Sequence, residues 1–282
     1  MKKLLALAAA LVLCLGLAAC GGAPAGEAEP KEDPGTASEP VTLKIGATPA
    51  PHQEILEQVV DVLAEQGITL EIVPYNDYIA PNTAVEEGEN DANFFQHITY
   101  MDNFNAERDT HLVNAGSIHY EPMGIYAGKS DSLDNVPDGA VIAVPNDTTN
   151  EGRALLLLQD LGLLTLKEDA GLEATPNDIA SNPKNLQFKE LEAAMLPQTI
   201  DEVDFSVINS NYALDAGLDP TKDALSSEDA QSDAAQAYTN IIAVKEGREN
   251  DEAIKALVAA LQSDEIKAFI ETTYKGSVVP MF

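Results

Sequence analysis

The chain of 282 residues has no tryptophan, two cysteines, and only 16 lysines and arginines against 47 aspartates and glutamates. Its formal net charge is therefore −31, which excludes sequence-independent binding to nucleic acid, since that needs cations facing phosphate. It equally excludes adhesion to anionic lipid through a basic patch. The hydrophobic content of 45% is ordinary for a globular protein. We expect a folded chain whose core is divided between two lobes.

Motifs of common enzyme classes are also missing. The sequence has no Gly-x-Ser-x-Gly, no His-Glu-x-x-His and no phosphate-binding glycine-rich loop that ends in Lys-Ser/Thr. The four histidines, at positions 52, 97, 111 and 119, lack the close spacing typical of metal ligands. A zinc site assembled only in three dimensions stays open. We therefore expect a binding protein that is not an enzyme and needs no cofactor.

The N-terminus has the pattern of an export signal over residues 1–19. A lysine pair precedes an apolar stretch over 4–17, which is shorter than the roughly 20 apolar residues of a membrane span. The order Leu-Ala-Ala-Cys at 17–20 resembles a bacterial lipobox, in which the cysteine is lipidated and the chain is cut just before it. Since Cys14 would be removed, Cys20 is the only thiol expected in the mature chain, with lipid attached. A plain signal peptide with an incidental cysteine is the alternative.

A linker of unusual composition follows the lipobox. Residues 21–40 contain no Val, Ile, Leu, Met, Phe or Tyr and are dominated by Gly, Ala, Pro and Glu. Such a segment has no apolar surface to bury, so residues 20–40 are predicted to be a lipidated cysteine and a flexible tether. The folded body would then be held at a membrane surface, on its extracytoplasmic side.

From Val41 onward, short apolar runs alternate with stretches of helical periodicity. The expected strands are 41–45, 69–73, 92–95, 112–115, 123–126, 141–144, 186–188, 203–208 and 241–244. The expected helices are 54–66, 83–89, 152–163, 252–262 and 264–273. This alternation predicts a largely parallel α/β architecture with ligands at the carboxyl ends of strands. The two series predict two lobes around a cleft: 41–126 plus 240–282 in the first, and 127–239 in the second.

Seven short segments carry a resemblance to a known family. They are Tyr75–Tyr78 with Pro81-Asn82, Asp91–His97, Val144–Arg153, Leu155–Leu158, Asn182–Leu186, Val207–Asn209 and Tyr238–Asn240. In this order they resemble the NlpA/MetQ family, the lipid-anchored substrate-binding proteins of bacterial methionine ABC importers. The resemblance spans most of the chain after Val41. It implies a two-lobed, periplasmic-binding-protein-like (type 2) fold, methionine as ligand, and the permease and ATPase subunits of an importer as partners.

Four polar residues are candidates for holding the head group of an amino acid. Asn150 and Arg153 lie where strand 141–144 gives way to the next helix, and a guanidinium binds both oxygens of a carboxylate. The residues alone equally allow a surface Arg153 paired with Glu151. Asn209 follows strand 203–208, where ligands of α/β proteins bind. The alternatives are that Asn209 is only a turn residue and that Asn211 caps the next helix. Asn240 precedes strand 241–244, and the resemblance implies that Arg153, Asn209 and Asn240 hold the backbone of the ligand.

Aromatic residues are candidates for the slot that takes the ligand side chain, since rings suit a thioether. These are Tyr78, Phe95, His97 and Tyr100, with His97 and Tyr100 one helical turn apart. Core packing is the alternative, above all for Phe95. The stretch 119–124 is given no ligand role. The resemblance leaves open whether the ligand is L-methionine, D-methionine or a methionine dipeptide.

A second hypothesis, from another functional class, remains open. The chain would then be a membrane-anchored surface protein that binds a metal ion or another protein. A substrate-binding protein should bury Arg153, Asn209 and Asn240 around one cavity, whereas a surface protein of that kind has no reason to gather them.

Overall fold

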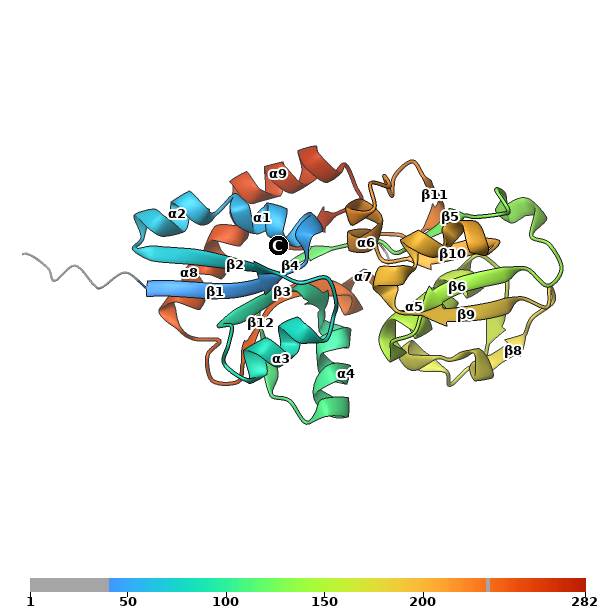
Figure 1. The fold of residues 1–282 in the computed structure, drawn as a ribbon, viewed down its shortest axis with the longest axis horizontal. Helices are drawn as coiled ribbons and strands as arrows, with labels where there is room; N and C mark the ends of the chain where they lie inside the picture. The colour runs from blue at the N-terminus through green and yellow to red at the C-terminus, as the bar shows by residue number, and fades with distance from the viewer. Residues whose placement is uncertain (1–40, 232–233) are drawn as a thin grey trace, which may run out of the picture. The chain divides into compact units, whose positions relative to one another are not determined.

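Two β-sheets, each covered by helices, organise the chain (Figure 1). The computed structural model describes residues 41–231 and 234–282, so the predicted signal peptide, Cys20 and tether lie outside the described residues. Within the described part, no helix combines the length and the apolar character needed to cross a bilayer.

The first sheet has the strand order β13-β4-β12-β3-β1-β2. Its strands are β1 (Val41–Ala47), β2 (Ile68–Pro74), β3 (Ala92–His97), β4 (Leu112–Tyr120), β12 (Thr239–Lys245) and β13 (Val279–Pro280). One face is covered by α1 (Glu54–Glu57), α2 (Val60–Glu65), α8 (Glu252–Leu261) and α9 (Asp264–Tyr274). The opposite face carries α3 (Ala80–Glu86) and α4 (Ile98–Arg108). Ile45, Phe94 and Ile242 are fully buried at the centre of this lobe.

The second sheet has the order β11-β5-β10-β6-β9. Its strands are β5 (Gly124–Ala127), β6 (Val141–Pro145), β9 (Gln187–Leu191), β10 (Phe205–Ile208) and β11 (Ala224–Ser227). The leucine-rich α5 (Thr148–Asp160) packs on one face, and α6 (Ser210–Asp215) packs on the other. A small antiparallel pair, β7 (Thr165–Leu166) and β8 (Ile179–Ser181), completes the second lobe. The short α7 (Ala234–Ala237) packs against Tyr120 at the end of β4.

Every strand and helix predicted from the sequence has a counterpart, but the structure differs from the prediction in three respects. The sheets are mixed rather than largely parallel, because β5 and β12 enter them antiparallel to their neighbours. The helix α4 was missed, since it buries few residues and has little apolar periodicity. The predicted first segment, 41–126, extends into the second lobe, because β5 pairs with β10 and β11.

The register of β12 decides which strand ends meet in the first sheet. This strand lies between β3 and β4 and runs antiparallel to both, so its beginning lies beside their carboxyl ends. Asn240 is thereby paired with His97 on one side and with His119 on the other. Polar residues that are far apart in sequence are thus gathered at one edge of the sheet.

Close packing also positions α5, which carries two of the predicted site residues. Its Gly152 is buried against the backbone of the following turn η3 (Gly171–Glu173). A Cβ atom at Gly152 would lie 2.2 Å from the carbonyl oxygen of Leu172 and 2.9 Å from the nitrogen of Ala174. Both atoms belong to the backbone and have little freedom to move aside, so the helix is held at a distance that only glycine allows.

Replacing Gly152 by alanine should therefore destabilise the protein, although glycine-to-alanine changes inside helices normally stabilise by about 1 kcal/mol. We expect the free energy of unfolding to fall by about 1–3 kcal/mol, which is the usual cost of overpacking. Urea denaturation of Gly152→Ala and of Asp160→Ala, an exposed position of the same helix, checks this. A stability equal to or above that of the wild type in Gly152→Ala would contradict the packing described.

Candidate ligand-binding site

Seven of the eight ligand-binding residues predicted from the sequence line one narrow pocket, with a cavity volume of about 20 Å³ in this structure. They are Tyr78, Phe95, His97, Tyr100, Asn150, Asn209 and Asn240. His97 is the last residue of β3, Asn240 is the second residue of β12, and Asn209 directly follows β10, so the pocket lies at strand ends contributed by both sheets. Four further residues, which the sequence did not indicate, complete the lining: Gln96, Glu121, Ser210 and Asn211.

One end of the pocket is aromatic. The ring centroid of Tyr78 lies 5.6 Å from that of Phe95 and 5.6 Å from that of Tyr100. The Tyr100 hydroxyl donates to the backbone oxygen of Tyr78 at 3.0 Å, which holds the two rings together. Ring faces and edges at this spacing suit an apolar, polarisable group such as a thioether.

The other end is formed by three asparagines whose hydrogen bonds leave two groups unused. The amide nitrogen of Asn209 donates to Asn150 Oδ1 at 2.8 Å, and Asn211 Oδ1 accepts from the Tyr78 hydroxyl at 2.6 Å. Asn209 Oδ1 and Asn211 Nδ2 are buried without a partner among the described residues. Since buried polar groups are normally paired, this acceptor and this donor are suited to a polar ligand.

His97 is neutral and has one defined tautomer. Its Nδ1 accepts from the backbone N–H of Tyr100 at 3.0 Å, so the proton is on Nε2, which lies 3.3 Å from Asn150 Oδ1. Burial, with a further contribution from Arg153, lowers the pKa of His97 to about 3. His97 is the N-cap residue of α4, Tyr100 lies in the first turn of that helix, and both residues line the pocket.

Arg153 is not among the lining residues. It is buried behind the pocket, where Nε and Nη2 donate to the two carboxylate oxygens of Glu228 at 2.8 and 2.6 Å. Nη2 also donates to the backbone oxygen of Glu121 at 2.7 Å, and the guanidinium lies over the Tyr238 ring. Burial alone would lower the pKa of Arg153, but Glu228 raises it above its ordinary value.

Two expectations about Arg153 were therefore wrong. The helix begins at Thr148, capped by Asp147, so Arg153 lies in the second turn and not at the N-terminus. The alternative pairing with Glu151 was wrong too, because the partner is Glu228, which lies 75 residues further along the chain. Direct contact of Arg153 with a ligand carboxylate stays a prediction.

A buried polar cluster forms the floor of the pocket beneath Asn240. Glu121 Oε1 lies 2.7 Å from His119 Nε2 and 3.2 Å from His52 Nε2, and the latter nitrogen lies 3.1 Å from Asn240 Oδ1. Burial lowers the pKa of His52 to about 4 and that of His119 to about 3, so both rings are neutral at pH 7. The sequence analysis gave 119–124 no ligand role, and the structure places Glu121 of this stretch in the pocket lining.

The missed residue Glu121 had a usable signal in the sequence. Strand β4 runs to Tyr120, five residues beyond the predicted end at 115. Had the apolar run been followed to its true end, Glu121 would have stood directly after a strand, where ligands of α/β proteins bind. Asn211 was noticed only as a helix cap, and the structure places it inside the first turn of α6.

The three residues of this cluster are also of the types that bind metal ions. One ligand atom from each of His52, His119 and Glu121 lies within 4.8 Å of the others. A histidine that binds metal through Nε2 normally donates its Nδ1 proton to a fixed acceptor. For His119 Nδ1 there is no such partner among the described residues. The geometry therefore fits a hydrogen-bonded cluster better than a metal centre.

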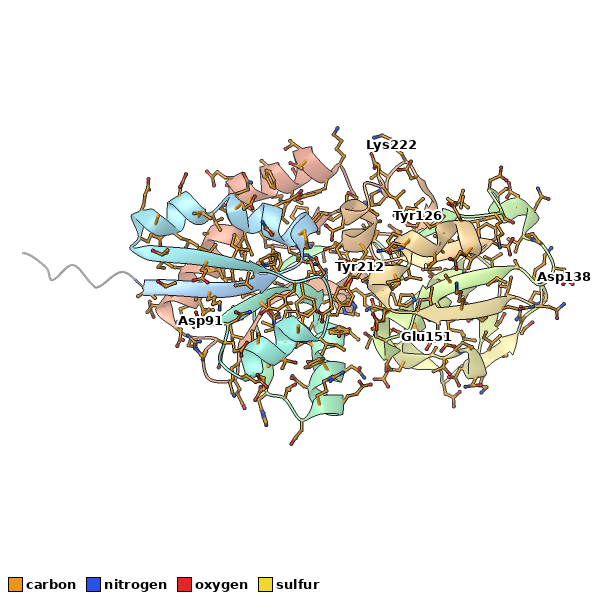
Figure 2. The ribbon with its side chains drawn as sticks, viewed as in Figure 1. Asp91, Tyr126, Asp138, Glu151, Tyr212 and Lys222 are labelled. Atoms are coloured by element: carbon orange, nitrogen blue, oxygen red, sulfur yellow. The ribbon has the colours of Figure 1, made fainter. Side chains whose placement is uncertain are left out.

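Direct contacts between the lobes close over the pocket. The Tyr78 hydroxyl of the first lobe reaches Asn211 of the second, and the ring of Tyr212, labelled in Figure 2, lies 5.0 Å from that of Tyr78. Thr148 donates to Glu107 at 3.0 Å across the same boundary. A second cavity of about 510 Å³ is lined by residues of these contacts and shares Tyr78 and Tyr100 with the pocket. The inner pocket is the better candidate site, because the buried polar atoms without partners lie there.

The family model of the NlpA lipoproteins matches residues 43–282. The chain belongs to the NlpA lipoprotein family. The methionine-binding lipoprotein MetQ of Bacillus subtilis (strain 168) is 40% identical over 285 residues, with 100% of this chain and 99% of that protein covered.

Solved structures of similar proteins confirm the fold. A nutrient-binding protein from Burkholderia cenocepacia, solved bound to methionine, is 44% identical and superposes with a TM-score of 0.79 over 85% of this chain and 100% of that one. A protein from Ruminococcus gnavus is 56% identical, with a TM-score of 0.85 over 86% and 99% of the two chains. The two-lobed, periplasmic-binding-protein-like architecture predicted from the sequence is thus confirmed.

Within this NlpA-family fold, Glu151 is a buried carboxyl outside the pocket, labelled in Figure 2. Burial, together with Glu190 and Asp147, raises its pKa from 4.5 to about 7. Between these values the folded state binds more protons than the unfolded state. The contribution of Glu151 to stability therefore falls as the pH rises through this window.

Glu151→Gln should remove this dependence. Its free energy of unfolding should exceed that of the wild type by about 2 kcal/mol at pH 8, and the difference should disappear near pH 4.5. Urea denaturation at pH 4.5, 6 and 8 measures it, with the exposed Glu168→Gln of the same lobe as control. A difference that is constant over this range would show that the carboxyl is not perturbed.

Proposed function

We propose that this NlpA-family protein captures methionine in the inner pocket and delivers it to the permease and ATPase subunits of an ABC importer. The observation that carries the proposal is the division of one buried pocket into an aromatic end and a polar end with unpaired groups. The two ends match the thioether and the charged head group of methionine. The methionine bound to the Burkholderia cenocepacia protein and the name of the Bacillus subtilis relative support the same ligand.

Residues of both lobes surround the pocket, which accounts for capture by closure. The aromatic end comes from the first lobe, and Asn150, Asn209 and Asn211 come from the second. A ligand touches both sets only when the lobes are shut, so binding shifts the population towards the closed form. Opening and release are left to the importer.

L-Methionine should raise the melting temperature of the purified protein, whereas lysine and glutamate should not, because the aromatic end has no charged partner for their side chains. At a thousandfold excess over Kd, the stabilisation amounts to about 4 kcal/mol. Differential scanning calorimetry with each amino acid, and with zinc alone, makes the measurement. Stabilisation by zinc but by no amino acid would replace this proposal with a metal-binding function.

The Asn240→Ala variant tests the site itself. It removes a donor at the polar end, and the loss of a hydrogen bond to a charged ligand group should weaken methionine binding at least about tenfold. Asn114→Ala makes the same change in the neighbouring strand β4, outside the pocket lining, and should bind as the wild type does. Equal affinity for a folded Asn240→Ala variant would remove Asn240 from the site.

The proposal includes a lipid anchor at Cys20, which the lipobox and the family of lipoproteins support. Expressed in a bacterium, the mature protein should begin at Cys20, carry acyl chains and partition into detergent. Cys20→Ser should leave the chain unprocessed or released, as seen by mass spectrometry and membrane fractionation. Cys14→Ser is the matched control and should be processed normally. A soluble wild-type protein with a free thiol at Cys20 would contradict the anchor.

A further inference from the structure

Three buried amide side chains, those of Asn82, Asn93 and Gln96, form a hydrogen-bonded cluster between α3 and β3. Asn82 Oδ1 accepts from Gln96 Nε2 at 2.6 Å and from Asn93 Nδ2 at 2.8 Å. Asn82 Nδ2 donates to Gln96 Oε1 at 2.9 Å, and Gln96 Nε2 also donates to Asn93 Oδ1 at 2.9 Å. Every oxygen and nitrogen of this amide cluster is therefore paired. A fully satisfied buried network of this kind is rigid and fixes the elements that carry it.

The hydrogen bond between Asn93 and Gln96 depends on an irregularity in β3. In a regular strand, residues three positions apart point to opposite faces of the sheet. Here Phe94 and Gln96 pair with consecutive residues of β12, so Phe95 between them is the extra residue of a β-bulge. Phe95 and Gln96 consequently both lie on the face that carries α3 and α4, whereas Phe94 belongs to the core on the opposite face.

The bulge lies directly beside the pocket. Without it, the alternation of the strand would turn Gln96 towards the apolar core in which Phe94 lies. The chain neighbours of Gln96, which are Phe95 and His97, both line the pocket. Because the amide cluster holds Gln96 on the side of α3, it also holds the bulge, and with it the direction in which these two rings point.

The amide cluster fixes the beginning of α3 as well. Asn82 lies in the first turn of this helix, and Asn93 Nδ2 donates in addition to the backbone oxygen of Pro81 at 3.2 Å. Tyr78 lies just before the helix, and its ring centroid is 5.6 Å from that of Phe95. The cluster thus holds both sides of the aromatic end, one through α3 and the other through β3.

We propose that the amide cluster, with Asn82 at its centre, positions the rings of Phe95 and Tyr78 and thereby makes the pocket select ligands with an unbranched side chain. This rests on the proposed function and adds the shape of the side chain that the site accepts. Asn82 is not among the lining residues, so it is a positioning residue that acts through its neighbours.

The selection follows from the small size of the pocket. The rings surround a cavity of only about 20 Å³, so a ligand side chain enters only as far as the rings yield. Rings that are held from behind yield little. A side chain that branches next to the backbone needs more room beside them than a straight one, and a fixed aromatic end therefore discriminates against it.

Calorimetric titration of the wild type and Asn82→Ala with three ligands tests the inference. The ligands are L-methionine, L-norleucine, in which a methylene group replaces the sulfur, and the branched L-isoleucine. The wild type should bind methionine at least about tenfold more tightly than isoleucine, because a misplaced methyl group in a fitted pocket has an effect of this size. In Asn82→Ala this preference should fall at least about threefold, since residues of one hydrogen-bond network are coupled. The two straight-chain ligands should weaken together.

A merely structural role of Asn82 predicts a different result. A variant that only populates the binding-competent form less often weakens all three ligands by the same factor, which leaves every ratio of affinities unchanged. Asn90→Ala is the matched control. Asn90 is a buried asparagine of the same lobe that donates to the Tyr75 hydroxyl at 3.0 Å, outside the amide cluster and the pocket lining. This variant should keep the preference of the wild type for methionine over isoleucine.

Asn93→Ala, which removes another member of the amide cluster, should show the same fall in preference as Asn82→Ala. An unchanged preference in either folded variant would overturn the inference and leave the proposed function intact. If both variants fail to fold while Asn90→Ala folds, the amide cluster is needed for the fold itself and the inference is wrong. Equal affinities of the wild type for methionine and isoleucine would overturn it too. A wild type that binds none of the three ligands would overturn the proposed function as well.

Discussion

The central place of β12 in the first sheet is the constraint on which the site depends. A strand hydrogen-bonded on both sides has no freedom to slip without turning its buried residues towards the other face. The pairing of Asn240 with His97 and His119 is therefore as fixed as the core itself. From this register follow the contact with His52, the orientation of the Asn240 amide and the place of Glu121 beneath it.

The two acidic residues near the pocket, Glu228 and Glu121, have different hydrogen-bond partners. Glu228 neutralises Arg153 through two short hydrogen bonds, and together they form a closed pair behind the pocket wall. Glu121 has one side-chain hydrogen bond among the described residues, with the neutral His119 ring, and burial raises the pKa of its carboxyl. Breaking the first pair would leave one of its two charges buried without a partner.

The features of the fold that could be predicted from the sequence depend on local patterns of apolar residues. The alternation of Val41–Ile45, the leucine-rich stretch of α5 and the apolar faces of α8 and α9 were sufficient to place strands and helices, since each pattern reflects one buried face. Helix α4 escaped because it buries mainly Tyr100, Met101 and Phe104 along an otherwise polar surface. The ends of strands and helices were predicted less accurately. Because the strand that corresponds to β4 was predicted to end at 115, the sequence analysis did not recognise that Glu121 directly follows a strand.

By itself, the sequence determined the alternating α/β elements, the family, and seven residues that come to line one pocket, because apolar periodicity and ordered motifs are properties of the chain. Tertiary structure alone decided the partners of the charged groups. Arg153 pairs with Glu228 and not with Glu151, and Glu121 meets His52 from another part of the chain. Such pairings depend on strand register and on the crossing between the sheets. No local pattern encodes them, since the interacting groups become neighbours only after the chain has folded.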